Sequence, residues 1–184
     1  ETFPLRGTGI GAMPVLSAVF DAADVGPLLI NFKGNRAIEG AALADMLENP
    51  AFRAKTFGVY GGAEPSRAAL AGTPGLVGFD RPALKDCLLR YVAVGWTGYV
   101  PQVCQDRIIA VPMDYAPYFW GWPHRFTDRM KAAGTEVILW GPYDGSGFSS
   151  GVDDVETLAQ VPPQFDGYIW TNRIEVIGPM MKYE

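Results

Sequence analysis

The chain has 184 residues, of which 48% are hydrophobic and 19% are charged, and its formal net charge is −5 at pH 7. A chain of this length and composition can bury a sizeable core, so we expect residues 1–184 to form a single domain. The acidic balance, without a cluster of Lys and Arg, argues against nucleic acid as a partner. Every apolar stretch is far shorter than the roughly 18 residues of a membrane span, so we expect no transmembrane segment.

The cellular compartment is predicted from the beginning of the chain and from its cysteines. Residues 1–12 resemble a loop inside a protein and lack an initiator Met, which suggests a processed or truncated product. No signal peptide is present, as in a mature periplasmic or secreted protein. Cys87 and Cys104 can form one disulfide in an oxidising compartment, or remain two buried thiols. We therefore expect a periplasmic or secreted protein, with the cytoplasm as the alternative.

Helices and strands are predicted to alternate along the whole chain. The first helix opens at Met13-Pro14, because proline suits a first turn and apolar residues then recur at helical spacing. Continuous apolar runs follow, which are typical of strands buried on both faces. The predicted strands are 28–33, 57–61, 76–80, 108–111, 137–140 and 168–171, and later helices begin near Ile38, Pro65, Ala83 and Arg125.

This alternation predicts parallel βα units, either in an open doubly wound sheet or in a (β/α)₈ barrel. The run Gly7-Thr-Gly-Ile-Gly11 has the wrong spacing for a dinucleotide fingerprint and precedes the first strand, which weakens the open nucleotide-binding sheet. Function in such folds lies at the carboxyl ends of the strands. The polar and aromatic residues after the last two strands are therefore of interest, namely Trp140, Tyr143, Asp144, Asn172 and Arg173.

Several segments, in order along the chain, resemble landmarks of the glycerophosphodiester phosphodiesterase family. That family shows a proline-led "P-T-L-x-E-x-L" helix, an "I-E-I-K" strand, a "V-x-V-W-T" strand and a final "G-I-I-T-D-x-P" strand. The matching segments here are Met13-Pro-Val-Leu-Ser-Ala-Val-Phe20, Leu29-Ile-Asn-Phe-Lys33, Val137-Ile-Leu-Trp140 and Gly167-Tyr-Ile-Trp-Thr-Asn-Arg173. The resemblance implies a TIM-type (β/α)₈ barrel that here lacks roughly its first three strands.

The resemblance also implies an activity, the hydrolysis of glycerophosphodiesters to an alcohol and glycerol phosphate with Ca²⁺ or Mg²⁺. The family motifs that carry this chemistry, "H-R-G", "E-x-D" and "H-D", lie before the proline-led helix and do not occur in this chain. The only histidine, His124, matches neither family histidine. We expect the catalytic histidines to lie upstream, and the 184 residues alone to be inactive.

The strand 28–33 carries the residues that match the family's metal and phosphate positions. Asn31 stands where the family has a metal-binding Glu. An amide oxygen can ligate Ca²⁺, but without negative charge it binds more weakly. Lys33 matches the family lysine, and its ammonium is suited to meeting a phosphate. A surface or structural lysine is the alternative.

Six further residues are candidates for substrate binding. Trp140 matches the family tryptophan that borders the site, although a core Trp is the alternative. The polar candidates Asp80, Arg81 and Asp114 follow strands, where helix caps and ion pairs are also common. Trp120 and Trp122 lie in an aromatic loop and are candidates for a lid or a stacking platform, with packing as the alternative.

Two functions fit these observations. The first is a metal-dependent phosphoric diester hydrolase that acts on a small glycerophosphodiester. The second is a non-catalytic relative that binds a sugar or polyol phosphate through aromatic and polar strand ends, with Asn31 marking lost metal chemistry. Missing strands would leave an open sheet edge and an exposed apolar interior, so we also expect self-association.

Overall fold

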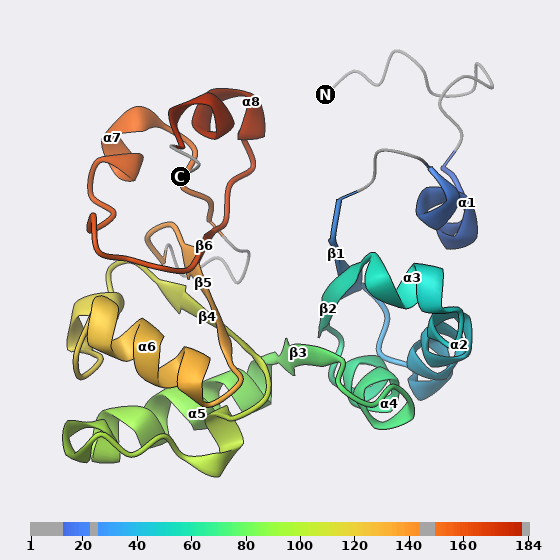
Figure 1. The fold of residues 1–184 in the computed structure, drawn as a ribbon, viewed down its shortest axis with the longest axis horizontal. Coiled ribbons are helices and arrows are strands. Elements are labelled where there is room, and N and C mark those ends of the chain that lie inside the picture. The colour runs from blue at the N-terminus through green and yellow to red at the C-terminus, as the bar shows by residue number, and fades with distance from the viewer. Residues whose placement is uncertain (1–12, 23–25, 144–149, 182–184) are drawn as a thin grey trace.

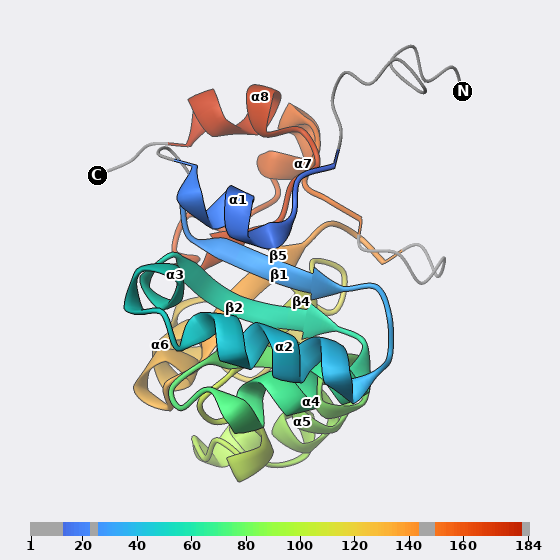
Figure 2. The same cartoon turned by 90° about the vertical axis from the view of Figure 1, so that its right-hand side faces the viewer.

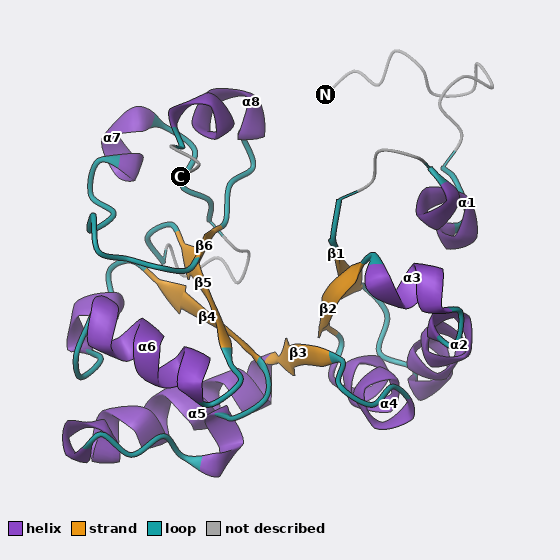
Figure 3. Cartoon of the chain, in the orientation of Figure 1, coloured by secondary structure: helices purple, strands orange, loops and turns teal. Residues whose placement is uncertain are grey.

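The structure is a computed structural model that describes residues 13–22, 26–143 and 150–181. Its strands and helices alternate as the sequence predicts (Figures 1 and 3). The strands are β1 Leu28–Phe32, β2 Thr56–Gly61, β3 Val77–Asp80, β4 Ile108–Pro112, β5 Glu136–Trp140 and β6 Tyr168–Ile169. The helices are α1 Leu16–Asp21, α2 Ala37–Leu47, α3 Pro50–Ala54, α4 Ala63–Gly72, α5 Arg81–Val94, α6 His124–Ala132, α7 Val155–Leu158 and α8 Ile174–Ile177, and short 3₁₀ turns occupy Gly95–Thr97, Gln102–Cys104, Ala116–Tyr118 and Gly178–Met180.

Local sequence explains where several helices begin. Asn49 caps α3 by accepting a hydrogen bond from the Ala51 amide at 3.0 Å, and Pro50 fills the first helical position. Asp80 caps α5 in the same way, through the Ala83 amide at 2.9 Å. The last residue of β3 is therefore also the cap of the helix that follows, so strand and helix join without an intervening loop.

All strand pairs in the described residues are parallel. The order is β1-β2-β3 in one sheet and β4-β5-β6 in the other. Figure 2 shows β1 and β2 running side by side in the same direction, with α2 and α3 in front of them. The six predicted strands and their parallel direction are thus confirmed, with ends that differ by one or two residues.

The predicted (β/α)₈ barrel is wrong, and so is its description as a barrel without its first three strands. The structure is a small α/β fold with two three-stranded parallel sheets. A barrel needs a hydrogen-bonded ladder that passes through all of its strands and closes. Here no ladder joins β3 to β4 within the described ranges, and β1 and β6 each pair with one neighbour only. In Figure 1, β3 lies between the two halves of the molecule.

Side chains, instead of a ladder, connect the two sheets. Phe79 of β3 packs with Ile108 and Ala110 of β4 and with Ile138 of β5 in one buried cluster, which we call the inner core. Residues of β1 and β2 pack against the same cluster. Helices cover the opposite faces: α2 and α4 enclose one outer core around Val59, and α5 and α6 contribute to the other.

A disulfide joins Cys87 of α5 to Cys104, which precedes β4. Both residues are fully buried in the outer core that contains Tyr91 and Phe126. Of the two possibilities left by the sequence, the structure contains the disulfide, and the described residues include no free cysteine. The bond closes a segment of chain with a sequence separation of 17.

We predict that the double substitution Cys87→Ala/Cys104→Ala will lower the free energy of unfolding by about 3 kcal/mol, because a closed loop of this length restricts the unfolded chain. Urea unfolding of the two proteins will measure the difference. Thiol titration of the denatured wild type, before and after reduction, is the control. Two reactive thiols before reduction, or equal unfolding midpoints, would contradict the prediction.

Candidate functional site

The carboxyl ends of strands from both sheets meet at a group of four aromatic rings. Tyr60 stacks on Phe79, with 5.4 Å between ring centroids, and meets the edge of Trp170 at 5.7 Å. Trp140 lies 6.2 Å from Phe79 and 6.4 Å from Trp170, also between centroids. These distances are those of favourable aromatic pairs. We call Tyr60, Phe79, Trp140 and Trp170 the aromatic cluster.

Backbone pairing holds each ring in place. Tyr60 and Phe79 are partners in the register of β2 and β3, so both side chains point to the same face. Trp140 is the last residue of β5. Trp170 follows β6 directly, where its amide donates to the Leu139 carbonyl at 2.9 Å and its carbonyl accepts from Val152 at 2.8 Å. Three of the four rings therefore lie on strands, and backbone hydrogen bonds fix the fourth, Trp170, directly after β6.

The two indole groups of the cluster carry hydrogen-bond donors without acceptors. The Nε1 atoms of Trp140 and Trp170 are buried, and neither has a hydrogen-bond partner among the described residues. A buried donor left without an acceptor costs about 1–3 kcal/mol. The cluster therefore combines apolar ring packing with two buried donors that remain unsatisfied within the described residues.

Asn31 lies at the edge of the cluster, beside Tyr60. The two residues are register partners in β1 and β2, and their side chains are hydrogen-bonded. Burial raises the pKa of the Tyr60 hydroxyl, and the hydrogen bond to Asn31 lowers it to a smaller extent. Gly61, with φ of +113°, allows this approach, since an added Cβ would lie 2.6 Å from Asn31 Oδ1.

Lys33 lies just after β1, two residues beyond Asn31. Its side chain is exposed, and it makes no ion pair with any residue that the structure describes. Its charge is therefore exposed just beyond the carboxyl end of β1. Of the sequence-predicted residues, Trp140 belongs to the cluster and Asn31 lies beside it.

The predicted polar candidates after β3 and β4 are engaged in structural contacts. Asp80 is only 4% exposed, caps α5 and forms an ion pair with Arg67 at 3.0 Å. Asp114 accepts a hydrogen bond from the Tyr143 amide at 3.0 Å. Arg81 is exposed at the first position of α5. These contacts favour the structural alternative for the two carboxylates.

The predicted aromatic loop packs away from the cluster. Trp122 packs against Phe126 and Phe165 in tilted pairs, with 5.8 and 5.3 Å between ring centroids. The indole of Trp120 donates to the Val92 carbonyl of α5 at 2.8 Å. Trp122 therefore packs against the outer core around α5 and α6, whereas Trp120 is 48% exposed and is tied to α5 by its hydrogen bond. The histidine of this region, His124, is exposed at the first position of α6.

The described residues do not fit a complete Ca²⁺ or Mg²⁺ site. Ca²⁺ takes six to eight oxygen ligands, and Mg²⁺ prefers carboxylates and water in an octahedral arrangement. No group of three or more His, Cys, Asp and Glu side chains capable of holding a metal occurs in the described parts of the chain. Asn31, the predicted ligand, offers one amide oxygen and is hydrogen-bonded to Tyr60.

Comparison with known proteins does not show a family for this chain. A scan of family models, a search of curated proteins and a search of solved structures each found no match to this chain. None of the helices in the described ranges is long and apolar enough to cross a membrane.

Sequence reasoning missed three members of the cluster, Tyr60, Phe79 and Trp170. Each lies at or next to the carboxyl end of its strand, as Trp140 does. An aromatic residue at this position in four strands is the signal that would have found them. Of the other residues expected near the last strands, Tyr143, Asn172 and Arg173 are exposed, and Asp144 lies outside the described residues.

Asp153 fixes the turn that follows Trp170. Its carboxylate accepts hydrogen bonds from the Asn172 amide at 2.6 Å, from Asn172 Nδ2 at 2.9 Å and from Thr171 Oγ1 at 3.1 Å. Partial burial raises the pKa of Asp153, but the hydrogen bonds outweigh it, and the pKa lies below its usual value. A carboxylate with a lowered folded-state pKa stabilises the fold above its unfolded-state pKa, and this stability is lost as pH falls through the folded-state pKa.

We predict that Asp153→Asn will lower the melting temperature at pH 7 by a few degrees, roughly the effect of 1 kcal/mol in a domain of this size. The difference from wild type should shrink as pH is lowered from 5 to 2, because the wild-type carboxylate becomes protonated. Thermal unfolding followed by circular dichroism will measure both. Asp128→Asn, at an exposed position of α6, is the matched control. A pH-independent difference would contradict this role of Asp153.

Proposed function

We propose that this protein binds a glycerophosphodiester at the aromatic cluster, as a relative of the glycerophosphodiester phosphodiesterases. The observation that supports this most is the pair of buried indole N–H groups without acceptors, on Trp140 and Trp170, at the carboxyl ends of parallel strands. Ligand sites of parallel α/β folds lie at these ends. The resemblance of the strand segments to that family points to the same ligand class.

The chemistry of the ligand fits the residues present. A phosphodiester carries one negative charge and oxygens that accept hydrogen bonds, which suits two indole donors in a partly dehydrated setting. We propose that the exposed ammonium of Lys33, just beyond the carboxyl end of β1, supplies positive charge to the bound phosphodiester. The glycerol carbons can lie against ring faces, as polyols commonly do on aromatic residues. An uncharged ligand with oxygen atoms would accept hydrogen bonds from the indole N–H groups but would gain no charge attraction from Lys33.

Hydrolysis of a phosphodiester requires water to attack phosphorus while the phosphorus–oxygen bond to the alcohol breaks and the alcohol takes up a proton. Among these residues, Asp80 and Asp114 are engaged in structural contacts and His124 is exposed on α6. The described groups thus favour binding over acid–base catalysis. We propose that any hydrolysis depends on groups other than these, such as the family histidines that this sequence lacks.

The first test of this proposal is calorimetric titration with glycerophosphocholine. We expect saturable binding by the wild type, and about tenfold weaker binding for both Trp140→Phe and Trp170→Phe, since each variant keeps an aromatic ring but loses one donor to a charged ligand. Trp96→Phe is the matched control, because Trp96 is 67% exposed in a different part of the chain. Unchanged affinity in both cluster variants would contradict the proposed site.

The same preparation distinguishes binder from hydrolase. Release of glycerol phosphate will be measured with Ca²⁺, with Mg²⁺ and with a chelator. Binding without release supports the non-catalytic alternative for these 184 residues. Release that Trp170→Phe diminishes supports a hydrolase. Release without any effect of the cluster variants would place the reaction elsewhere and overturn this site.

A further prediction concerns Lys33. Replacing it with Ala should weaken glycerophosphocholine binding about two- to fivefold, the effect expected for an exposed charge, and the loss should shrink at high salt. Lys85→Ala, also exposed but on α5, is the control. Weak binding of uncharged glycerol should be unaffected by either change. Equal loss in the two lysine variants would refute a specific role for Lys33.

A further inference from the structure

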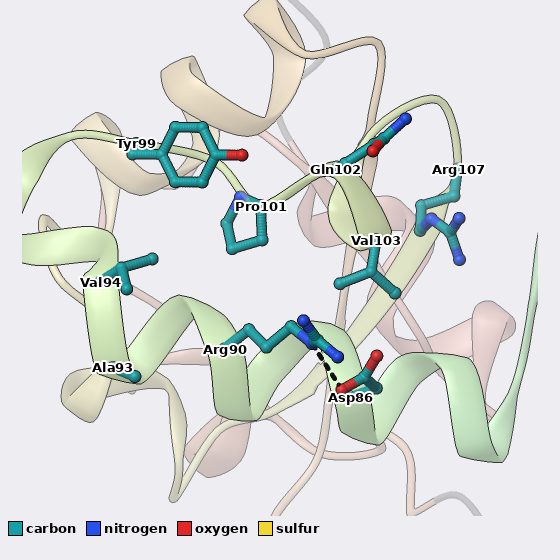
Figure 4. Close-up of a pocket in the computed structure, with 9 residues that line it drawn as sticks. All are labelled: Asp86, Arg90, Ala93, Val94, Tyr99, Pro101, Gln102, Val103 and Arg107. Atoms are coloured by element: carbon teal, nitrogen blue, oxygen red, sulfur yellow. Dashed lines mark hydrogen bonds and ion pairs between the residues drawn. The ribbon is translucent and has the colours of Figure 1, made fainter.

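A second candidate site lies on the other side of the strands. A groove of about 680 Å³ separates α5 from the segment that leads to β4. Figure 4 shows Tyr99 near one end of the groove and Arg107 at the other, with Pro101 and Val103 between them. Arg107 directly precedes β4, so the groove lies at the amino end of that strand, away from the aromatic cluster.

The charges of the groove leave one cation without a partner. Arg90 and Asp86, both on α5, form an ion pair at 2.7 Å. Arg107 forms no ion pair within 4.0 Å with any carboxylate of the described chain. Its Nε atom donates to the Gln105 carbonyl at 3.2 Å, and its other nitrogens have no acceptor in the part of the chain that the structure describes.

Arg107 is also partly withdrawn from water. Burial lowers the pKa of its guanidinium, while the more distant carboxylates of Asp80 and Asp106 raise it. A guanidinium presents five N–H donors in a planar fork that matches an oxyanion. When such a group is half-buried and unpaired, an anionic ligand can replace the water that it has lost.

The two walls of the groove are held at a fixed separation. The disulfide partner Cys87 adjoins Asp86 on one wall, and Cys104 adjoins Val103 on the other. A binding site that is already formed requires less ordering when the ligand arrives. The shape of the groove is therefore set by a covalent link between its two walls as well as by side-chain packing.

We propose that this groove binds a small organic anion, with the oxyanion at Arg107 and the apolar part against Pro101 and Val103. The volume suits a small molecule, since ligand sites usually measure about 300–1,000 Å³. Phosphate and carboxylate groups share the chemistry that Arg107 recognises. This proposal is separate from the proposed binding of a glycerophosphodiester, which takes place at the aromatic cluster and not in the groove.

Calorimetric titration with phenyl phosphate, benzoate and benzyl alcohol tests the proposal. We expect saturable binding of at least one of the two anions, much weaker binding of benzyl alcohol, and about tenfold or greater loss for Arg107→Ala. Tighter binding of phenyl phosphate than of benzoate identifies a phosphate site, and the reverse identifies a carboxylate site. Failure of both anions to bind, or equal affinity for benzyl alcohol, would overturn the proposal.

Two further variants keep the test independent of folding. Arg125→Ala removes an exposed charge from α6 and should leave anion affinity unchanged. Gln102→Glu, at an exposed position lining the groove, adds a negative charge and should weaken binding severalfold even if Arg107→Ala fails to fold. Anion binding that withstands both Arg107→Ala and Gln102→Glu would show that the groove is not the site.

Discussion

The whole structure depends on side-chain packing between two sheets that share no backbone ladder. Phe79 at the end of one sheet meets Ile108, Ala110 and Ile138 of the other in the inner core. This contact is apolar and non-directional, and its stabilising effect is roughly proportional to the area removed from water. It brings the ring of Tyr60 in β2 to 5.7 Å from the ring of Trp170, measured between centroids, although Trp170 follows a strand of the other sheet. Without the inner core, the aromatic cluster would not exist.

The cluster illustrates a balance between stability and function. Burial of large rings stabilises the junction of the sheets, but the two buried indole donors without acceptors reduce that gain. These donors lie where the carboxyl ends of strands from both sheets converge. Asn31 and Tyr60, hydrogen-bonded to one another, add polar groups at the same edge.

The two proposed sites use different parts of the βα units. The aromatic cluster lies at the carboxyl ends, where residues of several strands converge. The groove lies at the amino end of β4, where α5 and the segment around Pro101 are joined by the disulfide. In the first site, strand pairing sets the geometry. In the second site, the disulfide between Cys87 and Cys104 sets the geometry. There, Arg107, which has no ion pair among the described residues, is the proposed partner of the anion.

The sequence by itself determined the strands, their parallel direction and the helices between them. It did so because continuous apolar runs, proline and helix caps such as Asp80 act over a few neighbouring residues. It also placed Trp140 and Lys33 at strand ends. Only the tertiary structure decided that the ladder stops between β3 and β4, that Cys87 and Cys104 are bonded, and that Trp170 meets Tyr60. These outcomes join residues far apart in the chain, and they depend on which apolar faces pack together, which no local pattern specifies.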